Sequence, residues 1–199
     1  KAICCFNGID SFDFVSENLH EVYRVCKNKK KLQFKHRSEI TNLASEKNWT
    51  AVADRDSIVS LYLDKKLKFT IPLFSSSIKC LAINSTYHTV ICGTRDGFLL
   101  FGSLNSGIVR RTVNLCNMRP MQLLITPSWG FVAVYVSELC KGELIHAIKL
   151  FTVNGDFINS KIINHPVYSW TAFSTVHGFD YIIMTDTNND CFLFEAFYL

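Results

Sequence analysis

The segment that decides the fold is Val90-Ile-Cys-Gly-Thr-Arg-Asp96-Gly-Phe-Leu-Leu-Phe101, an apolar run, a polar turn and a second apolar run. This pattern predicts a β-hairpin. It occurs again in Ala51–Tyr62 and, with two extra turn residues, in Ile182–Phe194. An aspartate stands at the end of each turn, at Asp56, Asp96 and Asp190. The repetition indicates a fold built from copies of one unit.

The spacing of the hairpins gives the length of that unit. Asp56 and Asp96 are 40 residues apart, and Asp190 follows Asp96 after 94 residues, the length of two units. The missing unit lies between them, and a weaker one opens the chain. Each unit consists of apolar runs separated by turns. This pattern predicts blade-like units at about 1–36, 37–75, 76–118, 119–165 and 166–199. Four short strands per 40–50 residues are typical of a β-propeller blade.

The predicted fold class is therefore all-β, a single β-propeller with blades of four antiparallel strands. A β-sandwich is the alternative, but its strands alternate more strictly between apolar and polar residues than Phe131–Val136 does. The first residue is Lys1 and the last unit stops after its third strand, so we expect a fragment and an incomplete ring. In propellers that close by strand exchange, the N-terminal part supplies the last outer strand, which here would lie upstream of Lys1.

Composition narrows the class of protein. Of 199 residues, 48% are apolar, and the net charge of +4 is too mild for a strongly basic nucleic-acid binder. No apolar stretch approaches the roughly 18 residues of a membrane span. The eight cysteines lie mostly in apolar runs without a C-x-x-C pair, which predicts free buried thiols and a cytoplasmic location.

Two sets of residues carry a family resemblance. The run His36-Arg-Ser-Glu-Ile40, then Asp56, then Leu61-Tyr62-Leu63-Asp64 resembles a degenerate WD repeat, with Tyr62 at the tryptophan position. More specifically, the order of four further segments resembles the C-terminal WD-repeat region of BEACH-domain proteins of the neurobeachin and lysosomal-trafficking-regulator type. These segments are Ser77–Ile83, Cys92–Gly97, Leu124–Phe131 and Leu150–Ile158, and the resemblance covers about residues 36–199.

The resemblance implies a function that the spacing alone does not. In that family the propeller follows a BEACH domain and acts without catalysis as a scaffold in vesicle trafficking and membrane organisation. It implies other proteins as partners, with the adjoining BEACH domain among the contacts, and a cytoplasmic location with possible membrane association.

The residues themselves predict no enzyme, cofactor or metal site. Because Asp56, Asp96 and Asp190 recur at blade spacing, we expect their carboxylates to accept hydrogen bonds from N–H groups of their own turns. Asn154-Gly155 is a tight-turn dipeptide between strands. The six histidines show no zinc-ligand spacing, and no nucleophile or phosphate-loop motif is present. A propeller-based hydrolase with a central acidic site remains the alternative.

One segment concentrates positive charge. Between residues 27 and 37 lie six basic residues: Lys27, Lys29, Lys30, Lys31, Lys35 and Arg37. They fit a solvated hairpin tip, or a contact with anionic lipid headgroups or an acidic partner, worth about 1 kcal/mol per basic residue at a charged membrane. Nucleic acid is not an expected partner, because aromatic residues do not interleave this segment on one face.

Overall fold

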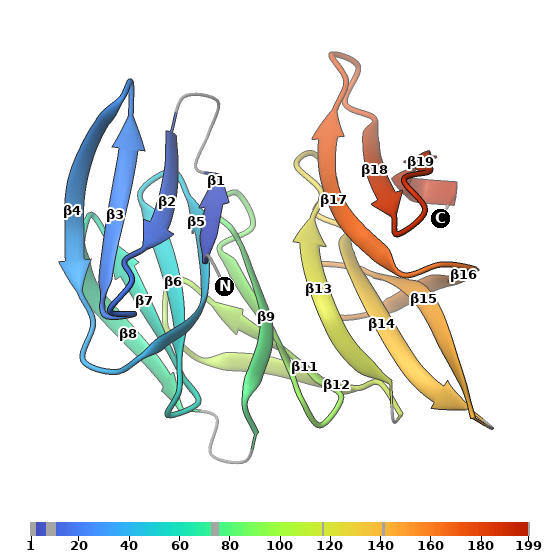
Figure 1. Cartoon of the computed structure of the whole chain (residues 1–199), viewed down its shortest axis with the longest axis horizontal. Coiled ribbons are helices and arrows are strands. Elements are labelled where there is room, and N and C mark those ends of the chain that lie inside the picture. Colours follow the sequence, from blue (N-terminus) through green and yellow to red (C-terminus); the bar gives the residue numbers. More distant parts are fainter. Residues whose placement is uncertain (1–2, 7–10, 73–75, 117, 141, 199) are drawn as a thin grey trace.

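The structure, a computed structural model, describes residues 3–6, 11–72, 76–116, 118–140 and 142–198. Within these ranges, nineteen strands form five antiparallel sheets, and the only helix is a 3-10 turn at Ala196–Tyr198. The all-β prediction is confirmed. Each sheet is a meander, in which consecutive strands are neighbours, as the hairpin repeat predicts (Figure 1).

The five sheets follow the chain in order, and we number them as blades. Blade 1 contains β1 (Cys4–Phe6), β2 (Ser11–Val15), β3 (Glu21–Cys26) and β4 (Lys29–Lys35). Blade 2 contains β5 (Ile40–Glu46), β6 (Trp49–Asp54), β7 (Ile58–Leu63) and β8 (Lys66–Pro72). Blade 3 contains β9 (Ile78–Asn84), β10 (Thr89–Thr94), β11 (Phe98–Ser103) and β12 (Val109–Asn114). Blade 4 contains β13 (Arg119–Ile125), β14 (Val132–Cys140), β15 (Glu143–Phe151) and β16 (Phe157–Ile163). Blade 5 contains β17 (Val167–Ser174), β18 (Asp180–Asp186) and β19 (Cys191–Glu195).

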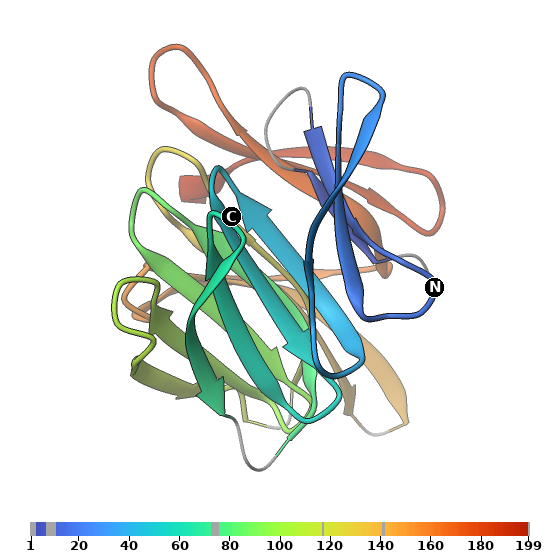
Figure 2. The ribbon, with the colours of Figure 1, turned by 90° about the vertical axis from the view of Figure 1, so that its left-hand side faces the viewer.

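The first strands of the blades lie side by side around the inside of the arrangement. Strand β5 contacts both β1 and β9, and β13 contacts both β9 and β17. Seen from the side of blade 1, successive sheets are rotated relative to one another instead of forming two facing layers (Figure 2). The chain therefore folds as a five-bladed β-propeller, as predicted, and the sandwich alternative is wrong.

Hydrophobic cores lie between blades, because a single sheet cannot bury both its own faces. In β6 the side chain of Val52 packs toward blade 1, whereas Ala51 and Ala53 pack toward blade 3. In β10, Val90 packs toward blade 2 and Ile91 toward blade 4. A further cluster joins blades 4 and 5. Middle strands buried on both faces explain the continuous apolar runs.

The two ends of the arrangement differ from its middle. Among the described residues, no hydrophobic cluster joins blade 5 to blade 1. Blade 5 has three strands, with β19 outermost, where the other sheets carry a fourth strand. This agrees with the expected end of the last unit after its third strand. A donated fourth strand stays a prediction.

The basic segment folds differently from a broad hairpin tip. Its turn consists only of Lys27 and Asn28, both with positive φ (46° and 63°), as a two-residue hairpin turn requires. Strand β4 begins at Lys29, so three lysines expected near a turn are strand residues. Their side chains therefore alternate between the two faces of blade 1.

The cysteines are less buried than predicted. All eight are free thiols, but only Cys80 and Cys92 are buried. Four are exposed: Cys4, Cys26, Cys116 and Cys191. Cys26 and Cys191 lie at strand ends, and Cys116 lies in a link between blades, so the apolar runs around them do not ensure burial.

Candidate functional site

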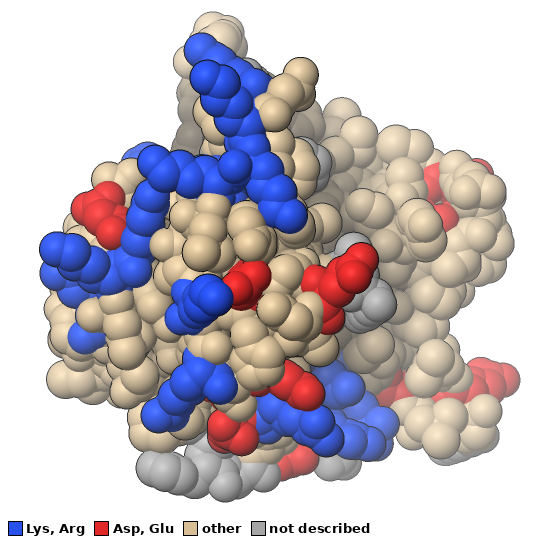
Figure 3. Space-filling view, turned by 60° about the vertical axis from the view of Figure 1, so that its left-hand side comes forward, with Lys and Arg blue, Asp and Glu red and all other residues tan. Residues whose placement is uncertain are grey.

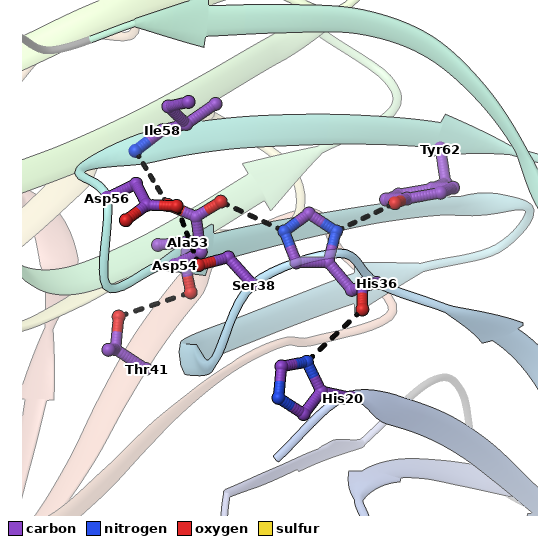
Figure 4. Close-up of polar contacts among 9 residues, drawn as sticks. All are labelled: His20, His36, Ser38, Thr41, Ala53, Asp54, Asp56, Ile58 and Tyr62. Atoms are coloured by element: carbon purple, nitrogen blue, oxygen red, sulfur yellow. Dashed lines mark hydrogen bonds and ion pairs between the residues drawn. The ribbon is translucent and has the colours of Figure 1, made fainter.

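A buried polar cluster joins blade 1 to blade 2 (Figure 4). His36 follows β4, and its Nε2 lies 3.0 Å from Oδ2 of Asp54 at the end of β6. Its Nδ1 lies 2.8 Å from the hydroxyl of Tyr62 in β7. A carboxylate only accepts, so in the neutral ring Nε2 donates and Nδ1 accepts the tyrosine proton. The ring of Phe34 stacks on Tyr62 with centroids 3.8 Å apart, which closes the cluster.

Asp54 also organises the turn that follows it. Its Oδ1 accepts from the backbone N–H of Ile58 at 3.0 Å. The same bond, from the N–H four residues on, recurs at Thr94 with Phe98 (3.2 Å) and at Asp186 with Asp190 (3.0 Å). The structural acceptor of each hairpin is therefore the last residue of its second strand, and this accounts for the repeat in three blades.

The three predicted turn aspartates consequently have other surroundings. Asp56 is exposed and accepts from the hydroxyl of Ser38 at 2.7 Å. Asp96 is exposed, and its backbone N–H donates to Ser76 Oγ at 3.3 Å. Asp190 donates its N–H to Asp186. The hydrogen bonds to turn N–H groups are accepted instead by residues two or four positions earlier in the chain. Only a side chain at the end of the second strand lies close enough to the N–H groups of the turn to accept from them.

Asn154 and Gly155 form the turn between β15 and β16. Gly155 has a φ of +86° and donates its N–H to the carbonyl of Thr152 at 2.9 Å. A Cβ at this glycine would lie 3.1 Å from side-chain atoms of Arg111 and Phe101 in blade 3. Arg111 in turn pairs with Asp156 at 2.5 Å. The turn therefore serves to dock blade 4 against blade 3.

Buried acids, which the hydrolase alternative requires, occur in blades 1, 2 and 5. Asp13 accepts two bonds from Arg24, at 2.7 and 2.8 Å. Asp180 in blade 5 accepts from the N–H groups of Ser128 (3.0 Å) and Trp129 (2.7 Å) in blade 4. Each of these carboxylates joins structural elements. Within the described ranges, no group of three or more His, Cys, Asp or Glu residues is placed to hold a metal ion.

Blade 4 contains a second buried pair of a histidine and a tyrosine. The Tyr135 hydroxyl lies 2.7 Å from Nδ1 of His146 on the neighbouring strand. Burial lowers the pKa of His146, because the uncharged imidazole is favoured away from water. A neutral ring can accept the tyrosine proton, so this pair resembles the His36–Tyr62 contact in a different blade.

The fold brings together lysines from three hairpin turns, and this set is named the basic surface: Lys27, Lys29, Lys31, Lys47, Lys65 and Lys66. All six are exposed, and all come from turns and strand starts at one end of blades 1 and 2. Figure 3 shows Lys and Arg side chains forming a continuous ridge across the upper part of this side. The turns are β3–β4, β5–β6 and β7–β8, which share an end because alternate turns of antiparallel meanders do.

The other predicted basic residues are placed elsewhere. Lys30 points to the opposite face of blade 1, with Nζ 4.1 Å from the ring centroid of Tyr23 and 5.0 Å from that of Phe14. Lys35 pairs with Glu21 at 2.9 Å. Arg37 lies in the link to blade 2, at the other end from the turns. Sequence reasoning missed Lys47, Lys65 and Lys66, which are distant from residues 27–37 in the chain.

Comparison of the sequence with known proteins identifies no family for the chain. No protein-family model matches the chain, and no curated protein matches it significantly. No helix in the described part of the chain has the length and apolar character of a membrane span. The five-bladed propeller is compatible with a WD-repeat propeller, and the buried His36–Asp54–Tyr62 cluster, with Asp54 in place of the expected Asp56, is compatible with the same resemblance.

Proposed function

We propose that the chain is a non-enzymatic protein-interaction scaffold, of the BEACH type that the segment order resembles, acting in the cytoplasm in vesicle trafficking and membrane organisation. The observation that carries the proposal is the apolar surface of blade 5. Leu193 is 59% exposed and Phe173 is 42% exposed. Contiguous exposed apolar residues on a folded domain mark interaction sites.

The geometry of that surface supports docking by a protein. Phe173 stacks on Tyr181 with ring centroids 5.6 Å apart, and both lie on the face of blade 5 turned away from blade 4. Leu193 pairs with Ile183 on the same face. Large side chains held on a sheet lose little conformational entropy on binding, which suits them to anchor a partner.

The test is a pull-down from cytosolic extract with the immobilised chain and a variant carrying Phe173→Glu and Leu193→Glu. The wild-type chain is expected to retain proteins that the double variant loses. Val176→Glu is the matched control, because Val176 is 97% exposed in the loop between β17 and β18. Retention of the same proteins by all three baits, or of none by the wild type, contradicts the scaffold proposal.

The basic surface favours a second candidate function, peripheral contact with an anionic membrane. Its six lysines share one end of blades 1 and 2, where several ammonium groups can face one negatively charged surface at once. Flotation with phosphatidylserine vesicles is expected to weaken with salt and with Lys29→Glu plus Lys31→Glu. The control is Arg37→Glu plus Arg95→Glu, which changes the same charge at the opposite end. Equal flotation of both double variants contradicts this candidate.

A further inference from the structure

A pocket of about 320 Å³ lies between blades 4 and 5. We name it the blade 4–5 pocket. Apolar and aromatic side chains, among them Ile163, Phe192 and Phe194, form most of its wall. Asp186 contributes the carboxylate, and Lys161 and His165 contribute basic side chains.

The register shows that this pocket corresponds to the His36 cluster of blade 2. Val167 pairs with Asp186 in blade 5 as Ile40 pairs with Asp54 in blade 2. The backbone N–H that follows the acid bonds to the carbonyl just before the first strand in both blades, Thr187 to Pro166 and Arg55 to Glu39. The two blades therefore superpose position by position through this region.

This correspondence identifies which residue replaces which. Ile163 precedes Val167 by four positions, as His36 precedes Ile40, so an isoleucine stands where blade 2 has its imidazole. Phe194 stands at the position of Tyr62, and Lys161 at that of Phe34. Lys161 Nζ lies 4.4 Å from the ring centroid of Phe194, so an ammonium over the ring takes the place of the stacked phenyl ring.

Asp186 keeps the turn bond that Asp54 makes but has no counterpart of the bond to His36. Its Oδ1 accepts from the N–H groups of Asn188 (2.8 Å) and Asp190 (3.0 Å). Its Oδ2 has no hydrogen-bond partner among the described residues, although the side chain is only 2% exposed. In Asp54 the corresponding oxygen bonds to His36 Nε2, and Asp186 lines the pocket together with Ile163.

The unpartnered acceptor decides the kind of group that fits. A buried carboxylate oxygen requires a donor. The ammonium of Lys161 on the same wall already supplies one positive charge, so a neutral N–H donor satisfies the oxygen without adding a second. The rings of Phe192 and Phe194 suit a flat heteroaromatic group, which stacks on them. An imidazole meets all three conditions, and blade 2 holds one against the equivalent acid.

We propose that the blade 4–5 pocket binds the imidazole of a histidine side chain presented by a partner protein, with a ring N–H donating to Oδ2 of Asp186. The proposal rests on the proposed scaffold function for the source of the histidine. The pocket and its acceptor do not depend on that function.

The test is titration of the 199-residue chain with small rings at pH 9, where imidazoles are neutral, followed by NMR of the Met184 methyl group. The probes are 4-methylimidazole, N-acetylhistidine amide and 1-methylimidazole, which lacks an N–H donor. The first two are expected to give saturable shifts, and 1-methylimidazole to bind about tenfold more weakly, as loss of one hydrogen bond to a charged acceptor predicts.

Two variants make the assignment specific. Asp186→Asn is expected to remove the preference for the N–H donor, whereas Asp190→Asn, in the exposed turn, keeps it. If Asp186→Asn does not fold, Ile163→His decides. It is expected to supply the ring from within the chain, abolish binding of 4-methylimidazole and raise the thermal midpoint.

Several results overturn the proposal. These are no saturable shift with 4-methylimidazole, equal affinity for 1-methylimidazole, or unchanged binding to Ile163→His. Binding of 4-methylimidazole without binding of the histidine amide also overturns it, because the pocket then takes a free heterocycle and not a protein side chain. The pull-down with the blade 5 surface variants remains informative in each case, since those residues lie on the other face of blade 5.

Discussion

His36 and Asp54 meet in the interior between blades 1 and 2, with Nε2 of the imidazole 3.0 Å from Oδ2 of the carboxylate. His36 lies in the link between the two blades, and Asp54 starts the β6–β7 turn. This hydrogen bond thus holds the segment that links blades 1 and 2 against the β6–β7 turn of blade 2. Its strength depends on burial, because water does not compete for either group.

The first prediction concerns this bond. His36→Ala is expected to lower the free energy of unfolding by about 3 kcal/mol, because it leaves the Asp54 oxygen and the Tyr62 hydroxyl buried without partners. Urea denaturation followed by tryptophan fluorescence measures the change. Ser38→Ala removes the exposed hydrogen bond to Asp56 and is expected to change the value by less than about 0.5 kcal/mol. Equal effects of the two substitutions would show that the buried cluster adds no stability.

The sequence predicts the propeller because the physics that builds blades is local. The apolar runs around Asp96 require a hairpin, and the absence of alternation in Phe131–Val136 requires burial on both faces. Neither inference needs knowledge of distant contacts.

The candidate site could not be predicted to the same degree. In the sequence, Asp54 and Asp56 both stand at the end of the same apolar run. Only the strand register shows that Asp54 is the last residue of the strand and accepts a hydrogen bond from the N–H of Ile58. An acceptor four residues before the third strand is the signal that would have found it. The basic surface depends on the stacking of blades 1 and 2, which places Lys65 near Arg24 around a small pocket.

The second prediction tests close packing between blades 3 and 4. A Cβ at Gly93 in β10 would lie 2.6 Å from Sγ of Cys80 and 2.8 Å from Cβ of Pro120. Gly93→Ala is therefore expected to lower the free energy of unfolding by about 1–3 kcal/mol through overpacking. Thermal unfolding by circular dichroism measures it. Gly142→Ala has no atom within 4 Å of the new Cβ and should cost only the strain of its positive φ, about 1 kcal/mol. A smaller loss for Gly93→Ala than for Gly142→Ala would contradict the close approach.

The third prediction concerns acid sensitivity at the contact between blades 4 and 5. Burial raises the pKa of Asp180, but hydrogen bonds from Ser174, Thr126 and the backbone of Trp129 and Ser128 outweigh it and hold the pKa below its ordinary value. A depressed folded pKa stabilises the fold above the unfolded pKa of about 3.9, and that stability is lost as the pH falls through the folded pKa.

Asp180→Asn should therefore cost about 1–3 kcal/mol at pH 7, and the cost should shrink when unfolding is measured below pH 3. Urea denaturation at several pH values gives the difference between the two proteins. Asp56→Asn, on an exposed turn, serves as the control and should show a small difference at every pH. A cost of Asp180→Asn that stays constant from pH 7 to pH 3 would mean that the charge of this carboxylate does not stabilise the blade contact.

The fourth prediction separates the cysteines by reactivity. The thiolate is the reactive form, and burial raises the pKa of Cys92 to about 12 and that of Cys80 further in the same direction. At pH 8 both thiols are protonated and shielded between blades, so iodoacetamide should leave them unmodified in the folded chain. Cys26 and Cys116 are exposed and should be alkylated under the same conditions. Mass spectrometry of the peptides, with a urea-unfolded sample in which all thiols react, gives the comparison. Alkylation of Cys92 in the folded chain at the rate of Cys116 would place β10 at a surface, and the stacking of blades 2, 3 and 4 around it would then be wrong.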